Sequence, residues 1–271
     1  MASLTQHDIS ILEKIKDPEA GPSAPLLIDP SLPKDPNISD ATLYQKVSNL
    51  ERTIVASIQE IELQIAGLKP TSSQSPPPLS QYLNCVKTLD DLIQEYPKYA
   101  SARNNRAQAL RRIYGDGILV KSPETYSLDE AKPLYTNASD EQLIQISSII
   151  LTDLTTAISL LTPRTPYMPL SPQSARTLSQ AYTQRGAFYH LTAKRLSLKG
   201  ADLRIEDGRE EKQWKTVEFE EHASRDFVMG GRYGNEIAKA LAVSANPTAK
   251  LCGEMVREAM RKEYAGAGQS V

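Results

Sequence analysis

The chain has 271 residues, of which 31 are basic and 33 acidic, so its formal net charge of −2 gives no bulk attraction to nucleic acid. Two cysteines, Cys85 and Cys252, are too few for a disulfide framework in a chain of this length and predict reduced, buried thiols in a cytosolic protein. The sequence shows neither the pattern of a secretion signal nor an apolar run of roughly 18 residues, so we expect a cytoplasmic protein, with the nucleus as an alternative location, and no membrane partner.

The first long element is a predicted helix over residues 43–65, because apolar residues recur there every three or four positions. They are Leu43, Val47, Leu50, Ile54, Ile58, Ile61 and Ile65. The stretch TSSQSPPP at 71–78 ends the helix, since consecutive prolines lack the backbone N–H groups that a helix needs. A second apolar helix face follows and ends before Pro97; its residues are Tyr82, Cys85, Val86, Leu89 and Leu92 or Ile93.

A third helix is predicted over residues 99–114, and the polar segment 117–138 after it is expected to be mobile. A further apolar helix follows, through Leu143, Ile146, Ile150, Leu154, Ile158 and Leu161. The connector TPRTPYMPLSP carries proline at every third position from Pro163 to Pro172. We interpret it as a stiff link between helices, with a polyproline II segment that docks in an aromatic groove as the alternative.

Ser171-Pro172 predicts the start of a helix that runs to about Lys194, because serine is a favoured N-cap and proline is favoured at the first helical position. Residues 195–212 are charged and contain glycine, so a mobile loop is predicted there.

A helix from about Trp214 to Met229 follows, with Gly230-Gly231 as its stop signal. Asn246-Pro247 then opens a last helix, to about residue 263. No strand pattern is evident along the chain. The predicted fold class is therefore all-α.

Two of these helices share one pattern. Aligning Arg106 with Arg185 places Ala107 over Gly186. The pattern resembles helix A of a tetratricopeptide repeat, whose eighth position requires a small residue because helix B packs close to it. Helix B should then carry a small residue, an aromatic residue and another small residue at set intervals. This pattern is present at Ala223, Phe227 and Gly230. In the preceding unit, its last two positions are occupied by Leu154 and Ala157.

These patterns predict a tetratricopeptide-repeat α-solenoid of about three helix pairs with long loops between its helices. The repeats are expected at about 43–97, 98–163 and 174–234, within a domain that spans 40–264. Residues 1–39 would form an N-terminal helical extension. Residues 235–264 would form a cap whose last helix covers the exposed end of the solenoid, and 265–271 a tail.

Four stretches of the sequence resemble one particular protein family, and the resemblance covers most of the chain. They are HDISILEKIKDPEAGP, ASARNNRAQALRR with Gly115-Asp116, SQAYTQRG, and FEEHASRDFVMGGRYGNEIAKALAVSANPTAKLCGEM. On these residues the chain is identified as a fungal-type member of the tetratricopeptide repeat protein 36 family. The resemblance implies a non-catalytic adaptor that binds other proteins. It also implies, as partners, an Hsp70-type chaperone or an enzyme of tyrosine breakdown, and a link to the regulation of tyrosine metabolism.

In a repeat of this type helix A lines a concave surface, which predicts the partner-binding residues. They are Ser101, Asn104, Asn105, Gln108, Arg111 and Arg112 in the middle repeat, and Gln180, Thr183, Gln184 and His190 in the next. Asn105 matches the asparagine of a clamp for acidic chaperone tails, but the basic pair expected in the next repeat falls on Gln180 and Gln184. Because amides bind a carboxylate more weakly than arginine does, only weak binding of an acidic tail is expected.

The alternative is a small-ligand-binding or catalytic protein whose groove is lined by Tyr182, Tyr189 and His190. The sequence gives it little support, since the three histidines have no cysteine or carboxylate cluster at metal-ligand spacing. The charged run EFEEHASRD is interpreted as a solvated helix face. No metal and no cofactor is predicted.

Overall fold

The computed structural model describes residues 26–70, 76–121, 132–165 and 167–267, with side chains to residue 261. The predicted leading helix within residues 1–25 lies outside this range. The described chain is all-α apart from one two-stranded sheet, which confirms the predicted class. Its eight helices are α2 (Ala41–Ile65), α3 (Pro78–Glu95), α4 (Ala100–Tyr114), α5 (Asp140–Leu161), α6 (Pro172–Leu196), α7 (Thr216–Arg232), α8 (Glu236–Ala245) and α9 (Pro247–Ala267).

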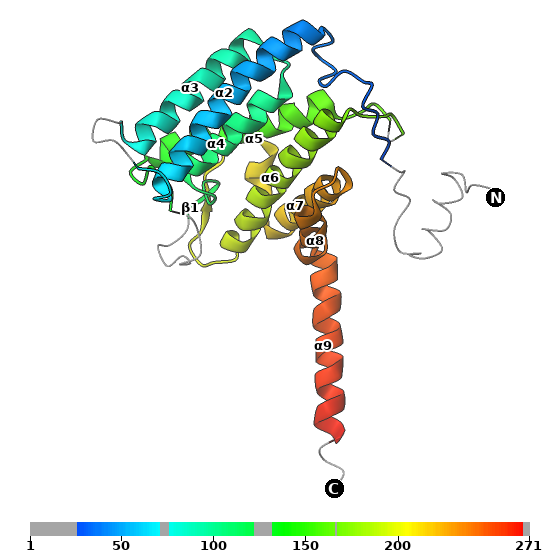
Figure 1. Ribbon diagram of the computed structural model, residues 1–271. Helices are drawn as coiled ribbons and strands as arrows, with labels where there is room; N and C mark the ends of the chain where they lie inside the picture. Colours follow the sequence, from blue (N-terminus) through cyan, green and yellow to red (C-terminus); the bar gives the residue numbers. More distant parts are fainter. Residues whose placement is uncertain (1–25, 71–75, 122–131, 166, 268–271) are drawn as a thin grey trace, which may run out of the picture.

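Each helix from α2 to α8 packs against the next one in the sequence, so the body is built from neighbouring hairpins (Figure 1). In addition, α4 contacts both α2 and α6 across the intervening helices. Two predicted helix starts are confirmed: the Ser171 hydroxyl accepts the Ser174 N–H at the start of α6, and the Asn246 side chain accepts the Thr248 N–H at 2.9 Å at the start of α9. The boundaries of the repeats themselves remain a prediction.

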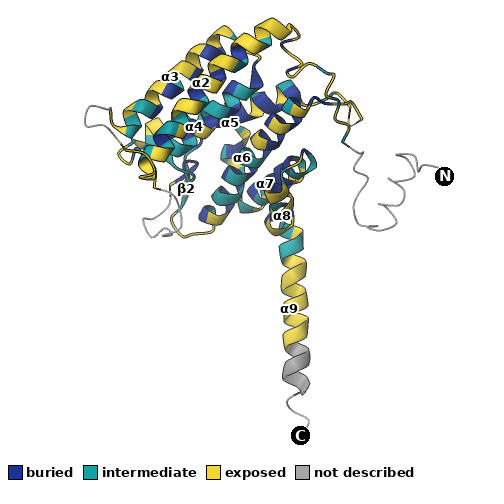
Figure 2. Ribbon diagram, in the orientation of Figure 1, coloured by how far each residue is buried: buried dark blue, intermediate teal, exposed yellow. Residues whose placement is uncertain are grey.

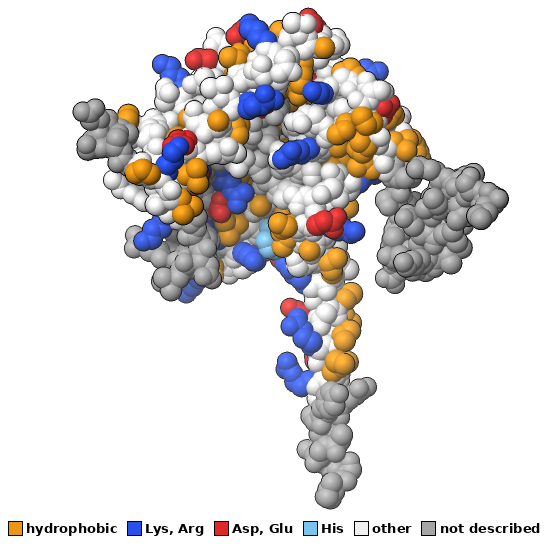
Figure 3. Space-filling view, in the orientation of Figure 1, with side chains coloured by type: hydrophobic (Ala, Val, Ile, Leu, Met, Phe, Trp, Pro, Cys, Tyr) orange, Lys and Arg blue, Asp and Glu red, His pale blue; other side chains and the backbone are white. Residues whose placement is uncertain are grey.

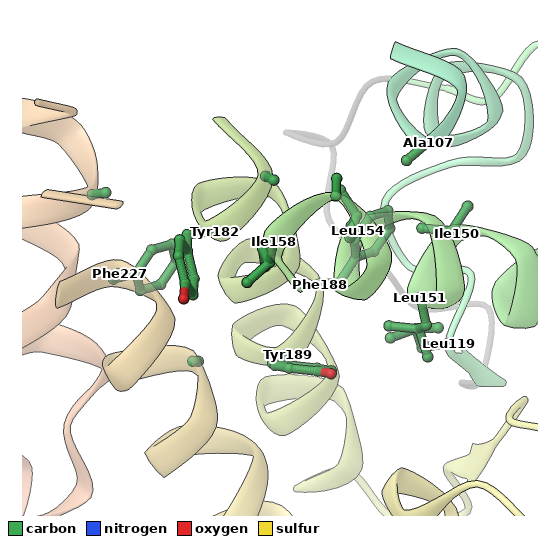
Figure 4. Packing of buried hydrophobic residues seen from close by; sticks show 14 of the residues in the cluster. Ala107, Leu119, Ile150, Leu151, Leu154, Ile158, Tyr182, Phe188, Tyr189 and Phe227 are labelled. Atoms are coloured by element: carbon green, nitrogen blue, oxygen red, sulfur yellow. The ribbon is translucent and has the colours of Figure 1, made fainter. Parts of the chain in front are cut away.

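The hydrophobic core forms two clusters that meet along α4. One lies between α2, α3 and α4, where Leu89 and Ile113 are fully buried. The other is larger and lies between α4, α5, α6 and α7, where Phe188 lies beside Leu154 and Phe227 lies beside Tyr182 (Figure 4). Because α4 supplies buried residues to both clusters, the two halves of the body are held in a fixed relation.

Helix α5 has the length and mean hydropathy of a membrane-spanning helix, at 1.6 over an 18-residue window. Its position explains this composition, since α5 lies between α4 and α6 and buries Ile150, Leu151 and Leu154 completely. Asp153 lies on the same helix and is also fully buried, as part of ion pairs with α4. The apolar character of α5 is therefore that of a helix in the core of this fold.

The small residues predicted at the helix seams lie in close contacts. A Cβ atom added to Gly186 would stand 3.1 Å from the Phe227 ring, and one added to Gly230 would stand 2.6 Å from the Thr183 hydroxyl. The prediction that Gly230-Gly231 ends α7 is wrong, because the helix continues to Arg232. These two glycines instead let α7 approach its neighbours, and the chain turns at Gly234, whose φ is +104°.

The two long loops are less irregular than predicted. Residues 122–131 lie outside the described range, but on either side of the gap the chain packs against the body. Strand β1 (Val120–Lys121) pairs antiparallel with β2 (Asp202–Leu203), so the loop between α4 and α5 binds the loop between α6 and α7. Ile118, Leu119 and Ile205 are buried at the base of this sheet. The described parts of the two segments therefore contact the body, and their mobility remains a prediction.

The proline connector 162–172 contains a turn, in which the Met168 N–H donates to the Thr165 carbonyl at 3.1 Å. It is tied to the N-terminal segment by a parallel bridge between Ile28 and Leu170. Of the two interpretations, the described residues fit a connector that is anchored to the body.

The C-terminal end differs from the prediction of a covering last helix. It is α8 that packs on α7 and buries Ala238, Ala242 and Ala245. Helix α9 extends away from the body, and its residues 251–261 are all exposed (Figures 1 and 2). The sequence pattern of α9 is amphipathic, but no described residue packs on its apolar side.

Candidate functional site

A groove of about 830 Å³ lies between α2 and α4, with Tyr82 of α3 in its wall. Its apolar lining is Val55, Ile58, Leu63, Ala66, Tyr82 and Ala109. Its polar lining includes four predicted partner-binding residues of α4, which are Asn105, Gln108, Arg111 and Arg112. Four of the six residues predicted for the middle repeat are thus gathered at one surface, which carries both apolar and polar groups.

The charged groups of this groove are already paired. Arg112 donates to Glu62 at 2.8 Å and to the Lys132 carbonyl at 3.0 Å. The Tyr82 hydroxyl donates to the same Glu62 carboxylate at 2.5 Å, and Arg111 forms an ion pair with Asp116. The groove therefore has no uncompensated positive charge from these two arginines.

Asn105 lies at the end of the groove and contacts a buried carboxylate. Its side-chain amide donates to Glu51 at 2.7 Å, and the Tyr99 hydroxyl donates to the other oxygen of Glu51 at 2.5 Å. Burial raises the pKa of Glu51 above its ordinary value, while these hydrogen bonds act in the opposite direction. Asn105 thus helps to hold α4 against α2 as well as lining the groove.

Asn104 lies inside the protein, with 1% of its surface exposed. The side-chain amide of Gln184 donates to its carbonyl oxygen at 2.9 Å, and Asn104 donates to Gln180 at 3.4 Å. These amides from α4 and α6 bond to one another across the body. Of the predicted residues in this network, Asn104 is not accessible to a partner in this conformation.

The remaining predicted residues of α6 face α7. The Thr183 hydroxyl donates to the Ser179 carbonyl at 2.6 Å and lies beside Gly230. The His190 ring lies against Phe227 at a centroid distance of 6.0 Å. Burial lowers the pKa of His190 to about 4, and Lys194 and Lys250 add to the shift. Thr183 and His190 therefore do not extend the groove of α2 and α4.

The residues of the alternative ligand site are also separated. Tyr182 stacks on Tyr233 at 6.0 Å, whereas Tyr189 packs against Trp214 at 5.3 Å and is buried. The two rings and His190 therefore pack against different neighbours and do not line a common cavity. This geometry does not support the alternative site as it was predicted.

Two buried ion pairs repeat in successive helix pairs, and sequence reasoning missed them. Arg106 of α4 binds Asp153 of α5 through two hydrogen bonds, of 2.6 and 2.7 Å. Arg185 of α6 binds Asp226 of α7 in the same way, at 2.7 and 2.8 Å. The alignment that places Leu154 over Phe227 also places Asp153 over Asp226. The repeated Arg and Asp positions could therefore have indicated these ion pairs from the sequence. The interpretation of Asp226 as part of a solvated face is wrong.

The described residues hold no group of three or more His, Cys, Asp or Glu side chains that could bind a metal ion. Cys85 is buried, as predicted, and burial raises the pKa of its thiol. Cys252 is exposed on α9, so the prediction of a buried thiol is wrong there. The reason is that the apolar face of α9, on which Cys252 lies, is not covered by any part of the chain that the structure describes.

No protein-family model and no solved structure matches the chain. Two relatives cover nearly its whole length. It is 35% identical to the L-tyrosine degradation gene cluster protein hmgX of Aspergillus fumigatus over 267 residues, which are 97% of this chain and 94% of that protein. It is 27% identical to tetratricopeptide repeat protein 36 of Danio rerio over 256 residues, which are 94% of this chain and 92% of the relative. Neither name is that of an enzyme. The chain belongs to the tetratricopeptide repeat protein 36 family.

Proposed function

We propose that the protein is a non-catalytic adaptor, built as a tetratricopeptide-repeat solenoid, that binds a segment of another protein in the groove between α2 and α4. The groove itself carries the proposal, because it gathers Asn105, Gln108, Arg111 and Arg112 beside an apolar wall. Interfaces of this mixed composition bind protein segments through apolar anchors and peripheral hydrogen bonds. The repeated seam and the Arg–Asp pairs at equivalent positions support the repeat architecture.

The chemistry of the groove favours a partner segment with apolar anchors over an acidic tail. The guanidinium groups of Arg111 and Arg112 are occupied by Asp116 and Glu62, and Gln180 and Gln184 carry no charge. A tail with two carboxylates would have to compete with these ion pairs. Binding of a chaperone's acidic tail is therefore expected to be weak.

The name of the fungal relative refers to the degradation of L-tyrosine. On this basis we assign the protein to the regulation of tyrosine metabolism, with an enzyme of that route as the first partner to test and an Hsp70-type chaperone as the second. Both contacts would be made in the cytoplasm or the nucleus. A small ligand in the groove is the second candidate function, since a volume of about 830 Å³ lies within the range of ligand sites.

A matched pair of variants tests the use of the groove. Leu63 lines it and is 42% exposed, whereas Leu83 of α3 lies outside it and is 43% exposed. We expect Leu63→Lys to reduce binding of the native partner, because a charge is placed against its apolar anchor, and Leu83→Lys to have no effect. Partners captured from the native cell are identified by mass spectrometry, and the affinity of each purified partner is then measured. Equal binding by both variants would exclude the groove.

A further inference from the structure

Helix α9 has an apolar face that nothing in the described chain covers (Figure 3). With 3.6 residues per turn, one half of its circumference carries Leu251, Cys252, Met255, Val256, Ala259 and Met260, and the other half carries Lys250, Glu254, Arg257, Glu258 and Arg261. Leu251, Met255, Val256 and Met260 are each more than half exposed. Within the part of the chain that the structure describes, α9 is anchored at its start, by an ion pair between Lys250 and Glu220 of α7.

A helix of this kind needs a partner to be stable. Isolated helices shorter than about 12–15 residues are marginal in water, and most helical stability in proteins comes from packing of an amphipathic face. The interior Gly253 costs about 1 kcal/mol more relative to alanine. The 21 residues of α9 are therefore expected to persist as a helix when their apolar face is covered.

The distribution of charge indicates what covers it. Glu254 and Glu258 border the edge of the apolar face formed by Leu251, whereas Arg257 borders the opposite edge. When two copies of α9 lie in parallel, the acidic border of each faces the basic border of the other. In an antiparallel pair, like charges would face each other.

The same charges argue against a lipid surface. An interfacial helix that binds anionic lipid is rich in Lys and Arg on its polar face. In α9 that face mixes three basic residues with two acidic ones over the described side chains. Its attraction to an anionic membrane is correspondingly small.

We propose that α9 pairs in parallel with α9 of a second copy of this chain, so that the protein is a two-fold symmetric dimer held by Cys252, Met255, Val256 and Ala259 and their counterparts. The apolar faces cover each other, and the mixed charges flank the seam. Such an isologous contact is the commonest way in which a chain forms a closed oligomer. The dimer would present two α2–α4 grooves, which increases the binding strength toward a partner that is itself oligomeric.

The mass of the full-length protein in solution tests the proposal, measured by sedimentation over a range of concentrations. We expect a dimer that Met255→Lys converts to monomer, while Val228→Lys leaves it intact. Val228 is a matched control, since it lies on α7 and is 54% exposed, against 63% for Met255. Both variants should keep the helicity and melting temperature of the body. A monomer at every concentration, or a dimer unaffected by Met255→Lys, overturns the proposal.

Two further measurements test the parallel orientation. Mild oxidation with diamide should link the two Cys252 thiols in the dimer, and Cys252→Ser should prevent the link, since Cys85 is buried. Glu258→Arg and Arg257→Glu should each weaken the dimer several-fold, and a mixture of the two variants should recover it as a heterodimer. A dimer without the Cys252 link and without this recovery refutes the parallel pair. A third outcome is that the protein forms no dimer but floats with anionic vesicles, and that Met255→Lys abolishes this flotation. That result overturns the proposal and assigns the apolar face of α9 to a membrane.

Discussion

Replacing Arg185 with methionine should strongly destabilise the protein, because it leaves the Asp226 carboxylate buried without its partner. The two groups share hydrogen bonds of 2.7 and 2.8 Å, and the Asp226 side chain is only 5% exposed. Removal of one partner of such a pair costs about 3–5 kcal/mol, mostly as the desolvation of the remaining charge. At about 2–4 °C per kcal/mol for a domain of this size, the melting temperature should fall by about 6–20 °C.

The double variant Arg185→Met/Asp226→Leu distinguishes a buried charge from lost packing. It removes both charges, and we expect it to recover most of the lost stability, since apolar replacements of buried ion pairs are often neutral. Lys46→Met is the control, because Lys46 and Glu95 form an exposed pair whose loss should hardly change the stability. Urea unfolding followed by circular dichroism measures all three. If the single and double variants are equally unstable, the argument from an unpaired charge fails.

The single variant should also acquire a characteristic pH dependence. Burial raises the pKa of Asp226, and without Arg185 this shift is opposed by the weaker interactions with His222 and Arg225 alone. A carboxyl group whose folded-state pKa lies above its unfolded value favours the folded state below the unfolded pKa and loses this contribution as the pH rises through the folded pKa. The stability deficit of Arg185→Met relative to the unmodified protein should therefore be larger at pH 7 than at pH 4. A deficit independent of pH would contradict this reasoning.

Two other predictions concern α6. Gly186→Leu should destabilise the protein by at least about 1–3 kcal/mol, because the new Cβ atom alone would lie 3.1 Å from the Phe227 ring. Gly253→Leu is the control and should not destabilise it, since no atom lies within 4 Å of a Cβ added there. The melting temperatures of the two variants test this difference. His190→Leu should remove a pH dependence: the pKa of His190 is lowered to about 4, so its contribution is present above the unfolded value of about 6.5 and is lost as the pH falls toward 4. Urea midpoints that fall equally between pH 7 and pH 4 in both proteins would show that His190 has no such role.

Much of the fold could be predicted from the sequence, because long helices with a regular apolar stripe carry a strong local signal. The small residues Ala107 and Gly186 also pointed to close helix contacts, as the distances from Gly186 to Phe227 confirm. Strands β1 and β2 could not be predicted, since two residues are too few to show a period. Their pairing depends on two loops that are distant in the sequence.

The candidate site was less predictable than the fold. Helical spacing placed Asn104 and Asn105 on the same helix as the groove residues, but it could not say that Asn104 meets Gln184 of α6. An amide that bonds to a neighbouring helix and an amide that awaits a partner have the same sequence signature. Likewise, the charges around His222 looked like one solvated face, although Asp226 turns inward to Arg185. Such distinctions depend on which helices become neighbours.

The pairing of β1 with β2 affects how the body comes apart. In an array of helix hairpins, each unit touches only its neighbours, so unfolding can begin at one end and proceed unit by unit. Here Val120 and Leu203 join the loops of two successive hairpins, and the Ser147 hydroxyl of α5 donates to the Arg204 carbonyl at 2.8 Å. The hairpin α6–α7 cannot detach while these contacts hold. The segment from α4 to α7 should accordingly exchange its amide hydrogens as one cooperative block, with α2 and α3 as a less protected flank.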